Sequence, residues 1–184
     1  MNWPNTISLF RISLAPLLLV ALLVRMPMSD LIAAALFIFA SATDGVDGYL
    51  ARRLKQVTRF GKLIDPVADK LLIAAALLAL VQLGRLPAWV ALVIIGRELA
   101  ITGLRSVAAA EGLVIPASAW GKAKTVFQIA GIAGIILAGS RLLHGFYWLT
   151  PLAWAVMWVA VVLTIYSGME YVYRYWRSAR AEGA

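Results

Sequence analysis

The chain has 184 residues, of which 62% are apolar and only 14% are charged, against roughly 25% charged residues in soluble domains. This composition indicates a membrane protein rather than a soluble enzyme or binding module. The absence of cysteine excludes a disulfide framework and a thiolate metal site.

Apolar runs recur along the whole chain, and a transmembrane helix needs about 20 such residues. The runs predict six transmembrane helices, at residues 7–27, 30–52, 63–83, 87–109, 121–140 and 147–173. Turns rich in glycine, proline and charge separate several of them, at RMPMSD, QLGRLP, EGLVIPAS and SRLLHGFY. We therefore expect an all-α, polytopic membrane protein in which residues 1–184 form a single domain.

Lysine and arginine are distributed unequally between the two sides of this predicted topology. The turns after the first, third and fifth spans contain Arg25, Arg85 and Arg141. The opposite side is richer, with Arg52, Arg53, Lys55, Arg59, Lys62, Lys122, Lys124, Arg174, Arg177 and Arg180. By the positive-inside rule the richer side is cytoplasmic, so both termini are expected there. Topology and contact with anionic headgroups explain the net charge of +8, and no nucleic acid partner is expected.

Four of the nine acidic residues lie in one stretch between two apolar runs, SATDGVDGYLARRLKQVTRFGKLIDPVADK. Asp44 and Asp47 are three residues apart near the end of the second predicted span, and Asp65 and Asp69 are four apart near the start of the third. Residues at these spacings share a helix face. A single aspartate there is typical of a solvated helix end, and nearby arginines could pair with one set. Four aspartates at helical spacings favour a functional site, because a charge inside a span costs about 3 kcal/mol or more.

Four converging carboxylates would repel one another unless cations lay between them. Oxygen ligands suit magnesium, manganese or calcium rather than zinc, and two bridged ions form a site for in-line displacement at phosphorus. Gly45, Gly48 and Ala51 keep the second predicted helix slim beside the aspartates. A ligand can therefore approach the backbone, where Arg52 and Thr58 can reach its phosphates.

Eight residues of this stretch follow the pattern D-x2-D-G-x2-A-R-x8-G-x3-D-x3-D, namely Asp44, Asp47, Gly48, Ala51, Arg52, Gly61, Asp65 and Asp69. The pattern resembles the signature of the CDP-alcohol phosphotransferase family. The resemblance implies six transmembrane helices and a homodimer. It also implies transfer of a phosphatidyl or alcohol-phosphate group from a CDP-linked donor, with release of CMP.

The same resemblance implies roles for individual residues. Two divalent cations, Mg²⁺ or Mn²⁺, would be held by Asp44, Asp47, Asp65 and Asp69, and Asp69 would also be the general base. The positions that match the CDP-diacylglycerol site are Pro4, Asn5, Ser8, Asp47, Gly48, Ala51, Arg52, Thr58 and Gly61. Ser8 stands where the N-terminal Pro-Asn-x-x-Thr element of the family has threonine.

Two further segments, IIGRELAITGLRSVAAAEG and WGKAKTVFQ, resemble conserved blocks of the bacterial phosphatidylglycerophosphate synthases within this family. They contain Arg97, Arg105, Lys122 and Lys124, which can hold a phosphate-bearing acceptor such as glycerol 3-phosphate. Snorkelling is an alternative explanation for the two lysines, and Arg97 with Glu98 can be a local structural pair. We expect phosphatidyl transfer to glycerol 3-phosphate in a bacterial inner membrane, with the active site facing the cytoplasm.

Other activities stay open at this point. Within the family, a cardiolipin synthase would use phosphatidylglycerol as acceptor, and a phosphatidylinositol-phosphate synthase would use inositol phosphate. A membrane prenyltransferase also uses aspartate-rich motifs and magnesium, but such chains are usually much longer. An ion-coupled transporter could use intramembrane acids as a relay, which would not explain why Gly48, Ala51 and Arg52 accompany them.

Overall fold

The computed structural model describes residues 3–24, 26, 28–54, 59–113, 116 and 118–182, with side chains described at 10, 12–24, 26, 28–43, 70–113, 116, 118–178 and 180. The described part is all-helical, without strands. Its helices are α1 (Trp3–Leu23), α2 (Ser29–Leu54), α3 (Arg59–Gln82), α4 (Ala88–Ala110), α5 (Ala119–Ala138) and α6 (Leu149–Glu182), with the 3-10 helix η1 (Arg141–Leu143) before α6. The predicted all-α fold class is confirmed, and the helices lie close to the predicted positions.

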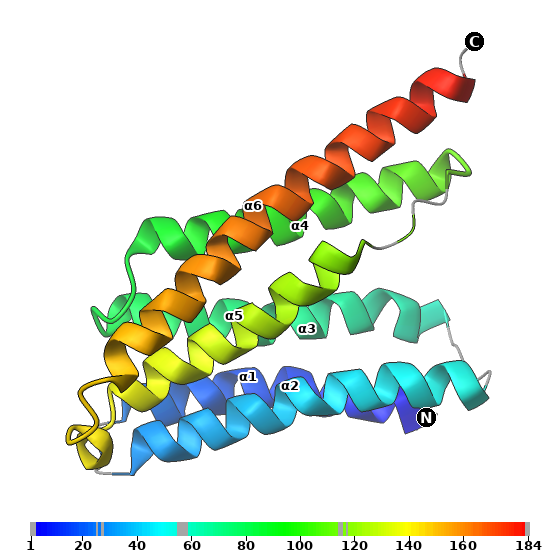
Figure 1. Ribbon diagram of the computed structural model, residues 1–184. Coiled ribbons are helices and arrows are strands. Elements are labelled where there is room, and N and C mark those ends of the chain that lie inside the picture. Colours follow the sequence, from blue (N-terminus) through cyan, green and yellow to red (C-terminus); the bar gives the residue numbers. More distant parts are fainter. Residues whose placement is uncertain are drawn as a thin grey trace.

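Successive helices run in alternating directions and form a bundle (Figure 1). α1 begins and α6 ends at the same end of this bundle, where α2 also leads into α3 and α4 into α5. The most extensive helix contact is that of α5 with α6, followed by α1 with α3, while α4 packs on α3 and α6. The end of α2, the start of α3 and the start of α5 therefore lie toward the same end of the bundle.

Local sequence explains several helix ends. The Ser118 side chain caps α5 by accepting a 3.1 Å hydrogen bond from the backbone N–H of Gly121. After α3 and α4 the chain passes through Gly84 and Gly112, whose φ angles are +67° and +79°. Residues with a Cβ atom rarely adopt this left-handed backbone conformation, so a glycine at each position allows the helix to end and the chain to turn.

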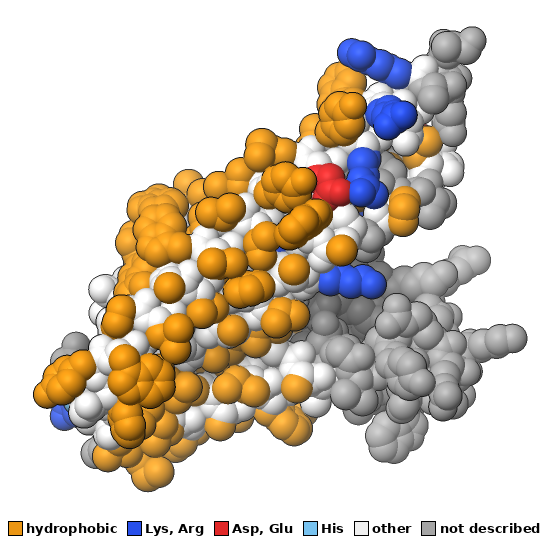
Figure 2. Space-filling view, in the orientation of Figure 1, with side chains coloured by type: hydrophobic (Ala, Val, Ile, Leu, Met, Phe, Trp, Pro, Cys, Tyr) orange, Lys and Arg blue, Asp and Glu red, His pale blue; other side chains and the backbone are white. Residues whose placement is uncertain are grey.

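Apolar side chains lie both inside and outside the bundle. The core is built from all six helices and includes Leu18, Phe37, Leu77, Ile94, Ile136 and Met157. Many large apolar residues are exposed as well, and Figure 2 shows them over most of the visible face, with lysine and arginine gathered toward the end where α6 finishes. Soluble monomers rarely expose so much apolar surface. The surface is typical of a membrane protein.

Two helices of the described part are long and apolar enough to cross a membrane, Ala119–Ala138 and Leu149–Ser178. Shorter apolar stretches occur at Ile12–Leu23, Ser29–Thr43 and Lys70–Gln82. Helix α4 is not one of the two, because it contains three charged residues, Arg97, Glu98 and Arg105. The six-span topology with cytoplasmic termini therefore stays a prediction.

At the other end of the bundle, Arg85 joins three segments. Its guanidinium lies in the turn after α3 and donates to both carboxylate oxygens of Asp30 in α2, at 2.6 and 3.2 Å. It also donates to the Gly139 carbonyl after α5, at 3.3 Å. A side chain at Gly139 would collide with the guanidinium. Asp30 is only 8% exposed, so water competes little for this charge-assisted contact.

Arg85→Gln is expected to lower the free energy of unfolding by about 2 kcal/mol, because the buried Asp30 carboxylate would lose its charged donor. Arg141→Gln is the matched control, since Arg141 is exposed and lines the same pocket as Asp30 and Arg85. Thermal unfolding of both variants in one detergent measures the difference in Tm. Equal shifts would contradict a specific contribution of the Arg85 contact.

Candidate active site

The four aspartates of the motif lie on neighbouring helices. Asp44 and Asp47 belong to the second half of α2, and Asp65 and Asp69 to the first half of α3. These helices contact each other and run in opposite directions, so the four positions lie toward the same end of the bundle. Their side chains are outside the described residues, and their convergence on metal ions stays a prediction.

The remaining positions of the predicted CDP-diacylglycerol site are also outside the described side chains; they are Pro4, Asn5, Ser8, Gly48, Ala51, Arg52, Thr58 and Gly61. By backbone, the first three lie in the opening turns of α1, at the bundle end that the aspartates share. Among the side chains that the structure does describe, no group of three histidine, aspartate or glutamate residues is placed to hold a metal.

Two of the four predicted acceptor residues meet at one carboxylate. Lys124 of α5 forms an ion pair with Oε1 of Glu98 in α4, and Arg97 Nη1 lies 3.4 Å from the same oxygen. The side chains of Lys124, Arg97 and Glu98 are 6%, 15% and 18% exposed. We call Arg97 and Lys124, together with the Glu98 that joins them, the cation cluster. Its side chains are shielded from water, which strengthens the attraction of the cations for a negatively charged ligand.

A line of hydrogen bonds connects the cation cluster to α6. Arg97 Nη2 donates to Ser167 Oγ at 3.0 Å, and Ser167 Oγ donates to the Thr164 carbonyl at 3.2 Å. Thr164 Oγ1 in turn accepts a 2.8 Å bond from Gln128 of α5. Arg97 Nε is buried and has no hydrogen-bond partner among the described residues. One donor of this guanidinium is thus unsatisfied in the structure.

The other two predicted acceptor residues lie outside the cation cluster. Arg105 is two turns further along α4, with its guanidinium 5.6 Å from the centre of the Tyr171 ring, a distance that allows a cation–π contact. Lys122 is exposed, and residues two apart point to different sides of a helix, so it does not share the direction of Lys124. Of the four predicted acceptor residues, Arg97 and Lys124 are the two that form ion pairs with Glu98.

Glu98 has a larger role in the structure than its sequence position indicates. The expected local contact with Arg97 is confirmed, but the ion pair with Lys124, 26 residues away, is not predicted from sequence. The sequence pattern does not indicate the contact of Ser167 either. The available signal was an acid within an apolar helix, since such a group is costly unless it has a partner.

The whole chain is similar to known phosphatidyltransferases. Residues 1–166 match the family described as CDP-alcohol phosphatidyltransferase. The CDP-diacylglycerol–glycerol-3-phosphate 3-phosphatidyltransferase of Bacillus subtilis is 44% identical, with 97% of each chain covered. The Pseudomonas fluorescens protein of that name is 39% identical over 100% of this chain and 94% of its own. A probable phosphatidylglycerophosphate synthase of Mycobacterium tuberculosis is 40% identical over 94% of this chain and 81% of its own. The motif, the helical bundle and these similarities agree, and the chain belongs to the CDP-alcohol phosphatidyltransferase family.

Proposed function

We propose that this protein transfers the phosphatidyl group of CDP-diacylglycerol to glycerol 3-phosphate, releasing CMP and forming phosphatidylglycerophosphate. The proposal rests on the similarity to relatives that are 33% to 44% identical over most of the chain and that are named as enzymes of this reaction. The shielded pair of cations, Arg97 and Lys124, supports an acceptor that carries a phosphate.

The proposed setting is the inner membrane of a bacterial cell, with residues 1–184 as one domain of six spans. Both chain ends and the active site would face the cytoplasm. In support, α1 begins and α6 ends at one end of the bundle, where lysine and arginine also gather. Glycerol 3-phosphate would enter from the cytoplasm, and CDP-diacylglycerol would enter laterally with its acyl chains in lipid. A homodimer is proposed from family resemblance.

Within this site Asp69 would accept the proton of the acceptor hydroxyl. The acceptor oxygen then attacks the phosphatidyl phosphorus, the bond to CMP breaks, and CMP leaves with the electron pair. The donor would be held by the motif positions on α1, α2, the α2–α3 connection and the start of α3. Those are Pro4, Asn5, Ser8, Asp47, Gly48, Ala51, Arg52, Thr58 and Gly61.

Two divalent cations, Mg²⁺ or Mn²⁺, fit the donor set that this chain offers. Asp44, Asp47, Asp65 and Asp69 are oxygen ligands on two contacting, antiparallel helices, and carboxylates are what these ions prefer. When bound, the cations would supply positive charge that stabilises the donor phosphates and polarises the acceptor hydroxyl.

The acceptor phosphate would lie against Arg97 and Lys124, with Arg105 and Lys122 as weaker candidates because they lie outside the cation cluster. Glu98 would keep the two cations close together before the acceptor arrives. The arrangement is positioned by contacts from three helices, α4, α5 and α6, so little reorganisation is needed on binding.

A panel of acceptors tests the proposed reaction. Purified protein is given labelled CDP-diacylglycerol with glycerol 3-phosphate, phosphatidylglycerol, inositol phosphate or serine, and CMP release is measured. The proposal requires glycerol 3-phosphate to support the fastest release. Faster release with phosphatidylglycerol or inositol phosphate would assign the chain to another activity of the family. Cation flux into liposomes without any CMP release would favour the transporter.

Arg97→Gln is expected to raise the KM for glycerol 3-phosphate about tenfold or more, because a charged hydrogen-bond donor to the phosphate is lost. The KM for CDP-diacylglycerol should change less than about twofold, because the donor contacts other helices. Initial rates of CMP release at varied concentrations of each substrate measure both constants. Lys122→Gln is the control, with a smaller effect on either KM. Parallel increases in both constants for Arg97→Gln would remove it from the acceptor site.

A further inference from the structure

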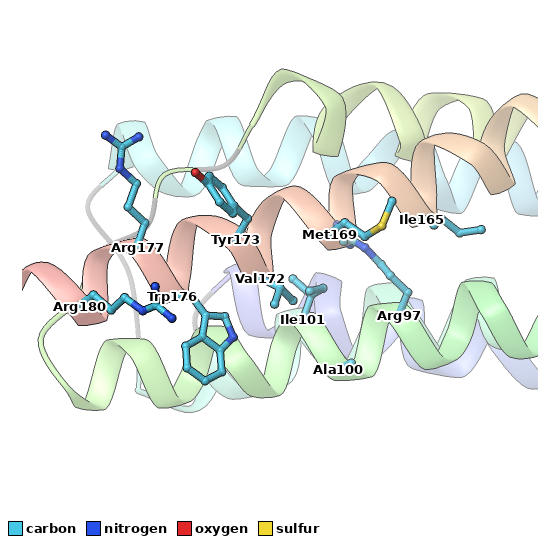
Figure 3. A pocket seen from close by; sticks show the side chains of 11 residues that line it. Arg97, Ala100, Ile101, Ile165, Met169, Val172, Tyr173, Trp176, Arg177 and Arg180 are labelled. Carbon is cyan, nitrogen blue, oxygen red and sulfur yellow. The ribbon is translucent and has the colours of Figure 1, made fainter.

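An open groove runs between α4 and α6 on the outer side of the bundle. It has a volume of about 860 Å³, within the range of roughly 300 to 1,000 Å³ that is usual for ligand pockets. Figure 3 shows Trp176 and Arg180 extending from α6 toward α4, while Arg97 extends from α4 toward α6 near Met169. Side chains of both helices thus approach one another across the groove.

Apolar groups line most of this α4–α6 groove. Ile165, Met169 and Trp176 are 45%, 61% and 59% exposed, and Ala100, Ile101 and Val172 complete the apolar wall. Such exposure is unfavourable in water at about 25 cal/mol for each Å², so an apolar occupant or lipid is needed to cover it.

The charges of the groove are all positive. Arg97 lies at its inner end, Arg177 and Arg180 lie toward the end of α6, and no acidic residue is among its described lining. Nearby, Glu170 already accepts a 2.5 Å hydrogen bond from Arg174, which does not line the groove. Charge complementarity therefore favours an anionic occupant.

The length of α6 sets the depth of these charges in the proposed membrane orientation. Its 34 residues span about 51 Å, whereas the hydrocarbon layer is about 30 Å thick and accommodates roughly 20 residues. Counting from Leu149, that layer ends near Met169. Arg177 and Arg180 lie two to three turns further on. Because α6 is inclined to the other helices (Figure 1), more of its length lies within the membrane than in an upright helix, and the long arginine side chains can reach the lipid headgroups.

We propose that the α4–α6 groove binds one molecule of an anionic phospholipid. An acyl chain lies along Ile165, Met169 and Val172, and the phosphate is bound by Arg180 next to the Trp176 ring. Arg177 extends from the other side of α6 and adds positive charge at the rim of the groove (Figure 3). A neutral phospholipid satisfies the apolar wall but leaves the arginines without a net negative partner, so binding is selective for anionic headgroups. This inference rests on the membrane orientation proposed above. It concerns a site that is separate from the aspartate motif and that shares only Arg97, at its inner end, with the proposed acceptor site.

Native mass spectrometry of the full-length protein tests the proposal. The protein is purified in neutral detergent and titrated with dioleoylphosphatidylglycerol or dioleoylphosphatidylcholine. Wild type should retain one phosphatidylglycerol at concentrations where phosphatidylcholine does not remain bound. Arg180→Gln should weaken retention about fivefold, because a headgroup-level arginine contributes about 1 kcal/mol. Arg177→Gln should weaken it less, because its side chain extends away from α4.

Arg174→Gln is the matched control, since it removes the same charge from the same helix but from a residue that is paired with Glu170. It should change retention by less than about twofold. If Arg174→Gln and Arg180→Gln weakened lipid retention equally, general surface charge would explain the retention, and the proposal would be overturned. Equal retention of both lipids by wild type would also overturn it.

A second readout locates the lipid. Phosphatidylglycerol with brominated acyl chains should quench the fluorescence of wild type more than that of Trp176→Phe, because Trp176 lines the groove. Identical quenching in both proteins would overturn the proposed location, and is the result expected if a second copy of the chain covers the groove. CMP release is measured on the same samples. CMP release without selective lipid retention would overturn this inference and leave the proposed function in place.

Discussion

Asp69→Asn is expected to lower kcat by about a hundredfold or more, the scale of general base catalysis. Asparagine keeps the shape of the side chain and one ligand oxygen, but its amide cannot accept the acceptor proton. The backbone position, well inside α3, should tolerate the replacement, so the variant should fold and retain much of its CDP-diacylglycerol binding. Turnover at saturating substrates and Mg²⁺ measures the effect.

Asp44→Asn is the matched comparison, because it removes a carboxylate from the same motif without removing the proposed base. It should weaken metal and donor binding together rather than kcat alone. If Asp69→Asn turns over at close to the wild-type rate with saturating magnesium, the base is another group and Asp69 is only a metal ligand.

Removing divalent cations is expected to reduce CMP release by about a hundredfold or more, because metal charge contributes several kcal/mol to such transition states. The protein is treated with chelator, its metal content is measured, and Mg²⁺ or Mn²⁺ is then restored. Activity should return with added Mg²⁺ or Mn²⁺, since four carboxylates offer oxygen ligands only.

The dependence on metal concentration provides the control for that experiment. Asp44→Asn should require more Mg²⁺ for half-maximal rate than wild type, whereas Lys122→Gln should not, because Lys122 is exposed on α5. Full activity in protein shown to be free of metal would contradict the two-cation proposal, even if the acceptor panel supported the reaction.

Helix positions in this protein are largely predictable from sequence. The predicted span at 87–109 corresponds to α4 at Ala88–Ala110. Its ends are predictable because Gly84 and Pro87 precede the helix and Gly112 follows it, and such residues mark helix boundaries. Helix α6 is the main difference, since it continues to Glu182 beyond the predicted limit at 173. Hydropathy detects where a helix would leave the hydrocarbon layer, whereas helix continuation depends on good helix formers such as alanine and arginine.

The candidate site was predictable to a smaller extent. The spacing of residues along a helix is encoded locally, so the shared faces of the aspartate pairs can be expected from sequence. The Glu98–Lys124 and Asp30–Arg85 pairs join residues 26 and 55 positions apart. Such partners depend on which helices become neighbours, and neighbouring helices are chosen by packing rather than by any local pattern.

The Arg85 contact has a mechanical consequence for substrate entry. It joins α2, the α3–α4 turn and the end of α5 at the end of the bundle away from the aspartate motif, so we expect any change in helix tilt to be largest at the motif end. Helix α3 has 24 residues and is about 36 Å long, so a tilt of about 3° would displace its far end by about 2 Å. We therefore expect the anchored end to act as a pivot, so that small rotations there widen the end of the bundle where the proposed substrates would meet.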